Sequence, residues 1–330
     1  MRRELRCRTE LWTLDEPFVI AGLVQRDTQL IVVEIGADGH IGRGETERDD
    51  LLATGRVNVP QEIEQARDAI ERGAGRQDLL DLLPAGPARS ALDCALWDLE
   101  SRIAQTPVWS LAGLPPPRPV TTAYTLRAGP APQMADDARR NTGRPLLKIK
   151  LEGARASECV EAVRNAAPRA MLIADANGSL SADLLTEVMD TCERNGVEMI
   201  EQPLPPGADD ALRGVEHTIA VCADESFLDR SSLSRVVGKY DMVNVKLDKT
   251  GGLTEALLSI EAARHAGLRI MVGCMLGTSL AMAPAHLLAS QAEHVDLDGP
   301  LMLGRDRTGG LRYAGSTVHP PEGGFWGWSG

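Results

Sequence analysis

The chain has 330 residues, of which 43% are hydrophobic and 25% charged, and it carries a formal net charge of -12. This composition is ordinary for a globular protein with room for one large α/β domain and a smaller one, and the acidic balance argues against nucleic acid or an anionic membrane surface as a partner. No run of about 18 apolar residues predicts a transmembrane helix, and six scattered cysteines without zinc-ligand spacing predict reduced thiols in a cytoplasmic protein.

The first part of the chain predicts a small α+β domain. Apolar patterning predicts three strands, at 5–14, 29–35 and 41–45. Between the first two lies Glu16–Thr28, which has no period of its own and is interpreted as a loop of the length typical of binding loops or lids. Helical spacing then runs from Pro60 to Gln105, and a proline-rich run at 114–119 marks the domain boundary.

Short apolar strands alternate with helical segments in the rest of the chain. Eight strands are predicted, at 120–126, 146–151, 171–175, 197–201, 219–223, 242–247, 269–273 and 294–298. Eight such units favour a closed (β/α)8 barrel of the TIM type over an open sheet, also because no GxGxxG follows the first strand. The sequence thus predicts an α+β capping domain at 1–116, a barrel at 117–300, and a C-terminal segment at 301–330 that returns to the capping domain.

The second predicted barrel strand, Leu146–Leu151, is apolar except for Lys148 and Lys150. Because side chains alternate along a strand, both lysines point to the same side of a strand that is covered on both faces. An unpaired ammonium group there costs several kcal/mol, roughly, so the pair predicts anionic partners, a metal-bound substrate or a lowered pKa. Two lysines that reach solvent from the end of the strand are the structural alternative.

Carboxylates end the next three predicted strands, and each lies one βα unit after the one before. They are Asp175, Glu201 and Asp224. The carboxyl ends of barrel strands form the face where barrel enzymes place their active sites. Three carboxylates at one mouth repel one another unless a hard cation lies among them, and oxygen ligands of this kind suit Mg2+. Three unrelated helix-capping acids are the structural alternative.

A further lysine, Lys246, ends the sixth predicted strand, which in a closed barrel lies opposite the second. Lys150 and Lys246 are therefore expected to face each other across the mouth, with the metal between them. This geometry predicts removal of a proton from the carbon next to a carboxylate on one face and its return on the other, while the metal stabilises the enediolate. Each lysine must be neutral to act as a base, so a lowered pKa is expected for both.

These motifs resemble those of the enolase superfamily, muconate-lactonizing subgroup, and within it the dipeptide epimerases. The resemblance covers essentially the whole chain. It rests on Lys148-Ile149-Lys150, Asp175-Ala176-Asn177, Glu201-Gln202-Pro203, Asp224-Glu225-Ser226, the run from Lys246 to Leu253, and Asp296-Leu297-Asp298-Gly299-Pro300. The last motif is the narrowest, because in dipeptide epimerases the matching aspartates bind the free α-ammonium group of the substrate and cycloisomerases lack the pair. Carboxylates at i and i+2 face the same way and suit a cation.

The resemblance implies a Mg2+-dependent dipeptide epimerase, which inverts the C-terminal residue of an L,L or L,D dipeptide by 1,1-proton transfer through a metal-stabilised enediolate. It implies two catalytic bases, Lys150 and Lys246. It implies three metal ligands, Asp175, Glu201 and Asp224. Substrate contacts would come from Lys148, Asp296 and Asp298, and supporting contacts from Asn177, Gln202, Glu225 and Asp248.

The substrate that the resemblance most commonly implies is L-Ala-D/L-Glu, from peptidoglycan turnover. Ala-Glu epimerases usually carry an arginine between the first two strands, whereas this chain has Gln25 there and Arg26 next to it. We therefore take Gln25 and Arg26 as the candidate contacts to the C-terminal side chain and expect a partner less acidic than glutamate to suit them. The alternatives are a cycloisomerase, N-acylamino-acid racemase or o-succinylbenzoate synthase-like activity, or a non-catalytic binding protein of the same fold; a homo-oligomer is left open.

Overall fold

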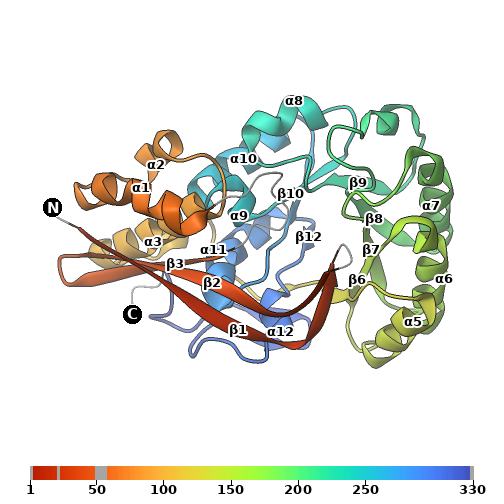
Figure 1. The fold of residues 1–330 in the computed structure, drawn as a ribbon, viewed down its shortest axis with the longest axis horizontal. Coiled ribbons are helices and arrows are strands. Elements are labelled where there is room, and N and C mark those ends of the chain that lie inside the picture. Colours follow the sequence, from red (N-terminus) through yellow and green to blue (C-terminus); the bar gives the residue numbers. More distant parts are fainter. Residues whose placement is uncertain (1–2, 21–22, 49–57, 328–330) are drawn as a thin grey trace.

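A long antiparallel ribbon opens the chain in the computed structural model, which describes residues 3–20, 23–48 and 58–327. Three strands form the first sheet in the order β1-β2-β3, namely β1 (Glu4–Ile20), β2 (Leu23–Ala37) and β3 (His40–Glu47). Figure 1 shows β1 and β2 sweeping from this sheet towards the barrel that the later part of the chain forms. Arg127, just after the first barrel strand, forms an ion pair with Glu16 of β1, so the ribbon contacts the rim of the barrel.

The prediction of a loop over Glu16–Thr28 is wrong. The backbone ladder between β1 and β2 runs from the pair Glu4 and Gly36 to the pair Ile20 and Leu23, with one irregularity between Thr13 and Phe18. A two-stranded ribbon of this kind is held by its own backbone hydrogen bonds and does not need the apolar alternation that marks a strand buried on one face. Residues 21–22, and the side chains of 18–24, lie outside the described part of the chain.

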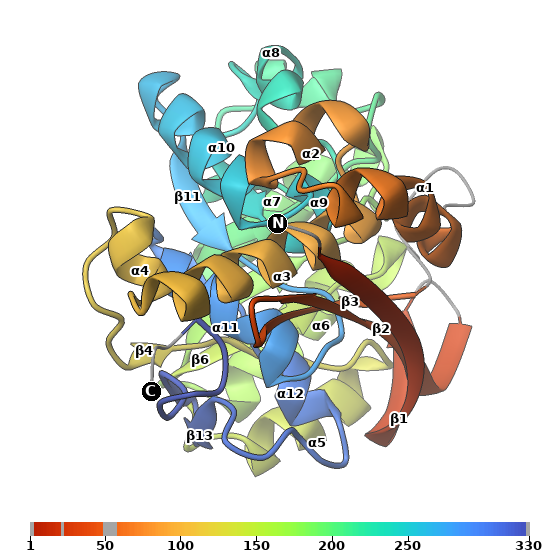
Figure 2. The same cartoon turned by 90° about the vertical axis from the view of Figure 1, so that its left-hand side faces the viewer.

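Three helices complete the capping domain and confirm the predicted helical segment. They are α1 (Val59–Glu71), α2 (Arg76–Leu82) and α3 (Pro87–Ala104). Helix α3 lies against the sheet, as seen from the capping-domain side in Figure 2. At Gly44 a Cβ atom would lie 2.0 Å from the carbonyl oxygen of Ala91, and at Gly42 2.1 Å from that of Ala95. Only glycine lets β3 approach α3 this closely.

Eight parallel strands form the second sheet, and they confirm the predicted (β/α)8 barrel. In order they are β5 (Tyr124–Leu126), β6 (Leu146–Lys150), β7 (Met171–Asp175), β8 (Val197–Glu201), β9 (Ala220–Ala223), β10 (Met242–Val245), β11 (Arg269–Val272) and β12 (His294–Val295). The backbone N–H of Ala123 donates to the carbonyl of Val295 at 2.8 Å, which closes the barrel between its first and last strands. The first predicted strand is in fact two, because β4 (Val120–Thr121) pairs with the C-terminal segment instead.

Helices cover the outside of the barrel. They are α5 (Ala131–Arg140), α6 (Ala156–Ala166), α7 (Ala182–Arg194), α8 (Leu233–Val236), α10 (Leu253–His265) and α11 (Ser279–Leu288), while α4 (Val108–Leu111) precedes β4. The short helices α9 (Leu247–Thr250) and α12 (Gly299–Met302) follow the carboxyl ends of β10 and β12 and contact α3 and β1 of the capping domain. Between β8 and β9 the chain has the 3-10 turn Asp210–Gly214 in place of a helix. Among the described residues, no helix has the length and apolar character needed to cross a membrane.

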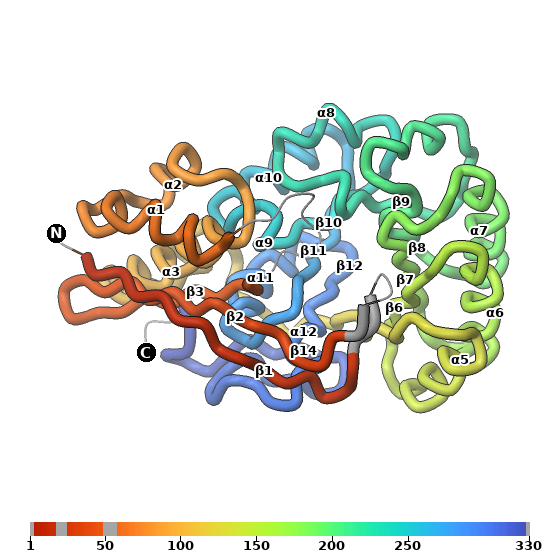
Figure 3. Tube along the Cα trace, viewed as in Figure 1, coloured from red at the N-terminus to blue at the C-terminus, as the bar shows by residue number. Residues whose placement is uncertain are grey.

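The C-terminal segment runs back to the capping domain, as the dark blue trace in Figure 3 shows. It contains β13 (Arg312–Ala314) and β14 (Thr317–His319), and β14 pairs with β4. Further on, the indole N–H of Trp326 donates to the carbonyl of Arg43 at 2.9 Å, and the N–H of Gly327 donates to Asp98 at 2.7 Å. These contacts tie the end of the chain to β3 and α3, and so help to hold the ribbon in place over the barrel.

Candidate active site

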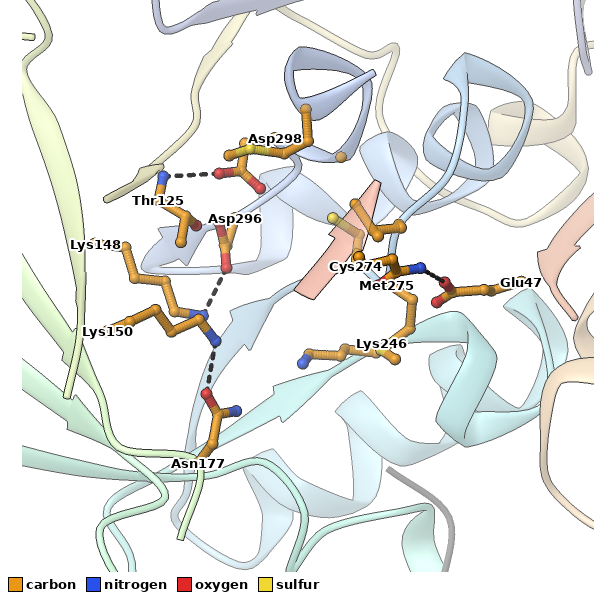
Figure 4. Close-up of a pocket in the computed structure, with 14 residues that line it drawn as sticks. Glu47, Thr125, Lys148, Lys150, Asn177, Lys246, Cys274, Met275, Asp296 and Asp298 are labelled. Carbon is orange, nitrogen blue, oxygen red and sulfur yellow. Dashed lines mark hydrogen bonds and ion pairs between the residues drawn. The ribbon is translucent and has the colours of Figure 1, made fainter. Parts of the chain in front are cut away.

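The carboxyl ends of adjacent barrel strands bring the predicted polar residues together. Lys150, Asp175 and Glu201 are register partners on β6, β7 and β8. Asp224 follows β9, and Lys246 follows β10. Since β6 and β10 lie four strands apart in an eight-stranded barrel, their lysines enter the mouth from opposite sides. Figure 4 shows Lys150 and Lys246 reaching towards each other across one pocket.

The lysines of β6 are both paired with carboxylates. The ammonium group of Lys148, whose side chain is buried, lies 2.9 Å from Asp175, 2.7 Å from Glu201 and 2.7 Å from Asp296. The ammonium group of Lys150 donates to Asp175 at 2.7 Å and to Asn177 at 2.8 Å. These ion pairs offset the desolvation cost of the buried Lys148 and the partly buried Lys150, and the structural alternative of lysines that reach solvent does not hold for Lys148.

Asp224 accepts two lysines, one on each oxygen. Lys246 donates to Oδ2 at 2.7 Å, and Lys249 lies against Oδ1 while also donating to the carbonyl of Asn244 at 3.0 Å. Lys249 was assigned no role from the sequence, because position alone does not show that the turn of α9 folds its side chain back to the strand end. The signal in the sequence is the spacing of three residues between Lys246 and Lys249, which one helical turn converts into proximity of both lysines to one carboxylate.

The pKa of Lys246 departs from the expectation. Burial lowers it, but the carboxylates of Asp224 and Glu201 outweigh burial and raise it above its ordinary value. The same balance, with Asp175 and Asp296 as the strongest partners, raises the pKa of Lys148. The lowered pKa was expected for the site with a metal among these carboxylates; with the carboxylates alone as the nearest charges, the pKa of Lys246 is raised.

The three predicted metal ligands are completely buried, and their donor chemistry fits a hard cation. Glu201 Oε1 accepts from the amide of Asn244 at 2.6 Å, whereas Oε2 receives no hydrogen bond and has an ion pair with Lys148. Burial, and after it repulsion from Asp175, raises the pKa of Glu201. A cation bound among the carboxylates would reduce this repulsion. In the side-chain positions seen here, ammonium groups lie among these carboxylates, and no three ligating side chains of the described residues converge on one metal position.

Asp296 and Asp298 form an acidic end of the pocket. Asp296 accepts from Lys148 through Oδ2, while its buried Oδ1 accepts no hydrogen bond. Asp298 Oδ2 accepts from the backbone N–H of Thr125 at 2.8 Å, across the seam of the barrel. Two buried carboxylates with acceptor capacity to spare can bind a cation that has several N–H donors.

The supporting residues hold the strand ends in place. Gln202, at a positive φ of 37°, accepts from the backbone N–H groups of Asp224 and Ser226 and donates to the hydroxyl of Tyr240. Asn177, also at positive φ, bridges Lys150 and Glu225.

The remaining predicted supporting residue, Asp248, behaves differently. It accepts from the hydroxyl of Thr46, so it joins α9 to β3 of the capping domain. This contact links the barrel to the sheet of the capping domain.

Comparison with protein families agrees with this geometry. Residues 2–113 match the family "Mandelate racemase / muconate lactonizing enzyme, N-terminal domain", and residues 133–325 match "Enolase C-terminal domain-like". The chain belongs to the enolase superfamily.

Relatives within the enolase superfamily include dipeptide epimerases. The chain is 41% identical over 319 residues to the L-Ala-D/L-Glu epimerase of Escherichia coli (strain K12), covering 96% of this chain and 99% of the relative. It also matches the crystal structure of an enolase family member from Agrobacterium tumefaciens with homology to dipeptide epimerases, which contains bound sodium and L-Ala-L-Glu. The TM-score is 0.94, and the sequence identity is 40%, with 98% of this chain and 99% of that chain covered. The dipeptide epimerase from Methylococcus capsulatus, complexed with Mg and the dipeptide L-Arg-D-Lys, matches at a TM-score of 0.87 and 28% identity over 98% of both chains. The predicted membership is confirmed.

The pocket of this enolase-superfamily chain is lined by residues of the barrel strand ends and of the capping domain. Gln25 lines it, whereas its neighbour Arg26 is exposed and does not. Sequence reasoning missed Glu47, at the end of β3, which also lines the pocket. It also missed Asn244, although the i, i+2 relation to Lys246 places both on one side of the strand.

The pH dependence of substrate binding tests Asp298. Burial, followed by repulsion from Asp296, raises the pKa of Asp298 to about 7. Its carboxyl is therefore neutral below that pH and ionised above it, so affinity for an ammonium group rises as the pH rises through about 7. We expect kcat/KM of a dipeptide to rise over this interval and Asp298→Asn to lose the rise. An unchanged pH profile in the variant would remove Asp298 from ammonium binding.

Proposed function

We propose that this protein is a Mg2+-dependent dipeptide epimerase, an isomerase that inverts the α-carbon of the C-terminal residue by 1,1-proton transfer. The observation that carries the proposal is the pair Lys150 and Lys246, which reach from opposite sides into one pocket that ends in Asp296 and Asp298. Two bases on opposite faces of one carbon are what inversion requires, and the dipeptide epimerases among the relatives support the substrate class.

The chain's carboxylates supply the metal site in this proposal. Asp175, Glu201 and Asp224 would hold Mg2+, because they are buried, lie on adjacent strands and offer only oxygen donors. When bound, Mg2+ supplies a Lewis acid that stabilises negative charge on the substrate carboxylate and offsets the charge of its own ligands.

Proton transfer is assigned to the two lysines. The neutral amine of one lysine takes the α-proton and becomes an ammonium group, and the ammonium group opposite gives its proton to the other face of the carbon. Asn177 holds Lys150 in position and Asp224 holds Lys246, each through a hydrogen bond to the nitrogen that carries the proton. Because the two lysines exchange roles in the reverse direction, the same site inverts either stereoisomer.

The ends of the dipeptide are bound by the remaining predicted residues. Asp296 and Asp298 accept the α-ammonium group of the first residue. Lys148 lies within hydrogen-bond distance of Asp175, Glu201 and Asp296. Lys148 therefore fixes the distance between the two aspartates that bind the α-ammonium group and the catalytic lysine on its own strand.

Deuterium exchange tests the proposal. The protein, supplied with Mg2+ in D2O, is incubated with a library of L,L and L,D dipeptides, and loss of the α-proton signal is followed by NMR while mass spectrometry shows whether product and substrate differ by deuterium alone. We expect exchange and inversion without any change in composition. A product that has lost or gained atoms would indicate elimination or cycloisomerisation, and a library without any exchange would contradict an epimerase.

The cellular setting is proposed on separate grounds. All six cysteines are free thiols, which supports the reducing cytoplasm as the location. A role in peptidoglycan turnover depends on Ala-Glu being the substrate and stays a prediction.

A further inference from the structure

We propose that Asp209, on the loop between β8 and β9, positions the metal ligand Asp224 through a chain of buried hydrogen bonds. Asp209 does not line the pocket, so it acts through other side chains and is a positioning residue. This inference rests on the proposed function, because it concerns the carboxylates that would hold Mg2+.

The loop that carries Asp209 takes the place of a helix. Asp209 directly precedes the 3-10 turn Asp210–Gly214 and is 1% exposed, whereas its neighbour Asp210 is exposed. Burial of a charged group costs free energy unless the charge is paired and hydrogen-bonded. The burial of Asp209 on a loop therefore requires specific partners.

Both oxygens of Asp209 have such partners. Oδ1 accepts from the ammonium group of Lys239 at 2.5 Å, and Oδ2 accepts from the hydroxyls of Ser226 and Tyr240, each at 2.7 Å. Burial raises the pKa of Asp209, but the hydrogen bonds from these three groups outweigh burial and hold the pKa below its ordinary value. Because an ionised carboxylate can only accept, both hydroxyl protons point towards Asp209.

The two hydroxyls in turn orient the side chain of Gln202. Their protons are directed to Asp209, so their oxygens can accept from a further donor. The amide nitrogen Nε2 of Gln202 lies 2.9 Å from the hydroxyl of Ser226 and 3.0 Å from that of Tyr240, and it donates to the carbonyl of Leu204 at 2.8 Å. The nitrogen end of this amide is thus surrounded by acceptors, which leaves its oxygen Oε1 to face donors.

Gln202 connects these contacts to all three proposed metal ligands. Its Oε1 accepts from the backbone N–H of Asp224 at 3.0 Å. It directly follows Glu201 in the chain, and its own carbonyl accepts from the N–H of Gly178 at 2.7 Å, three residues after Asp175. One residue therefore contacts the ends of β7, β8 and β9, where the three carboxylates lie.

The backbone of Gln202 needs this support. Its φ of 37° lies in the left-handed region, which is uncommon for a residue other than glycine. Such a conformation persists where the surrounding structure determines it. Loss of the Asp209 charge or of the Tyr240 hydroxyl would weaken that support, so the strand ends that carry Glu201 and Asp224 would hold their carboxylates less well for a metal.

Mg2+ titration of two variants tests the proposal. Asp209→Asn keeps the size of the side chain and removes its charge, and Tyr240→Phe removes one hydroxyl while the ring stays in the core. The Kd of Mg2+ is measured by isothermal titration calorimetry without dipeptide, and the Tm without Mg2+ is measured alongside. We expect the Kd to rise about 10–100-fold in each variant, the range for residues that support metal ligands. The double variant should bind about as weakly as the weaker single one, because both changes act through Gln202.

Asp210→Asn is the matched control. It removes the same charge at the neighbouring position, where the side chain is 83% exposed and lies 3.5 Å from the same Lys239. Its Kd for Mg2+ should equal that of the unmodified protein. Tyr240→Phe changes no charge, so weaker binding in that variant cannot come from a lost negative charge, and it provides a result even if Asp209→Asn does not fold.

The outcomes separate this inference from the proposed function. An unchanged Kd in Tyr240→Phe and in Asp209→Asn, whatever their Tm, overturns the inference while the metal site and the epimerase remain. An equal rise of the Kd in Asp210→Asn also overturns it, because the effect would then follow charge alone. Absence of Mg2+ binding by the unmodified protein overturns the metal site and the inference together. Weaker Mg2+ binding in both variants of a protein that exchanges no dipeptide supports the inference and contradicts the epimerase.

Discussion

Alanine in place of Lys150 or Lys246 is expected to lower kcat for epimerisation by about 10²–10⁴-fold, the range that a positioned acid or base contributes. Each lysine serves one face of the α-carbon, so either loss stops inversion even though the other lysine remains in place. KM should change less than kcat, because Asp296, Asp298 and the carboxylate-binding groups are unaffected.

Exchange from separate stereoisomers distinguishes a proton-transfer role from a structural one. With one lysine missing, the other can still remove the α-proton that faces it and return deuterium to the same face. We therefore expect each variant to exchange one stereoisomer only, and the two variants to exchange opposite ones. The measurement is the α-proton signal of L-Ala-L and L-Ala-D dipeptides in D2O, followed by NMR.

Arg72→Ala is a suitable control for these variants, since its side chain is 74% exposed and its charge lies on the capping domain. It should keep exchange from both isomers. Normal inversion by both lysine variants, or exchange of the same isomer by both, would contradict the assignment of one lysine to each face.

The strand-end residues could be predicted because they depend on two regular periods. Alternation along β6 places Lys148 and Lys150 on one side, and the length of a βα unit brings Asp175 and Glu201 into register on adjacent strands. Both periods follow from backbone geometry, and the spacing of residues in the sequence shows them directly. The closed barrel then places Lys246 opposite Lys150 without further information.

The side of the pocket that the capping domain forms could not be predicted in the same way. Glu47 reaches the site because the capping sheet lies over the barrel, and no local period connects β3 with β6 or β10. The continuation of β1 and β2 through Glu16–Thr28 was missed because its ladder needs no apolar alternation, and with it the contact between Gln25 and Glu47. Long-range docking of the two domains therefore brings Glu47 to the pocket, which sequence reasoning could not show.

The carboxylate nearest to Lys246 could not be identified from the sequence for a related reason. The sequence shows that cations cluster at the barrel mouth, which by itself lowers lysine pKa values. The distance of 2.7 Å between Lys246 and Asp224 reverses that effect, because the nearest charge is opposite in sign. The sign of each charge can be read from the sequence, whereas the distance between two charged groups depends on the fold.

Removal of one carboxylate from the proposed metal site should weaken stabilisation by Mg2+ and lower activity with it. Glu201→Gln keeps the shape of the side chain and keeps an oxygen that can accept from Asn244, so the fold is expected to persist. It removes the negative charge that Oε2 shares in the ion pair with Lys148, and a lost metal ligand should cost at least the roughly 10–100-fold in affinity known for residues that merely support ligands.

The measurement is the Tm as a function of Mg2+ concentration, followed in the absence of substrate. For the unmodified protein, Mg2+ at about 100 times its Kd should add about 2.7 kcal/mol to the free energy of unfolding, because it binds the folded state. Glu201→Gln should shift this curve to higher Mg2+ concentration, and kcat at saturating dipeptide should fall with it. Glu198→Gln makes the same change on the same strand, at a side chain that is 44% exposed, and should leave both curves in place. A Tm that responds to Mg2+ equally in Glu201→Gln and the unmodified protein would mean that the carboxylate at the end of β8 does not bind the metal, and Asp175 and Asp224 would then lack the third ligand on which the site depends.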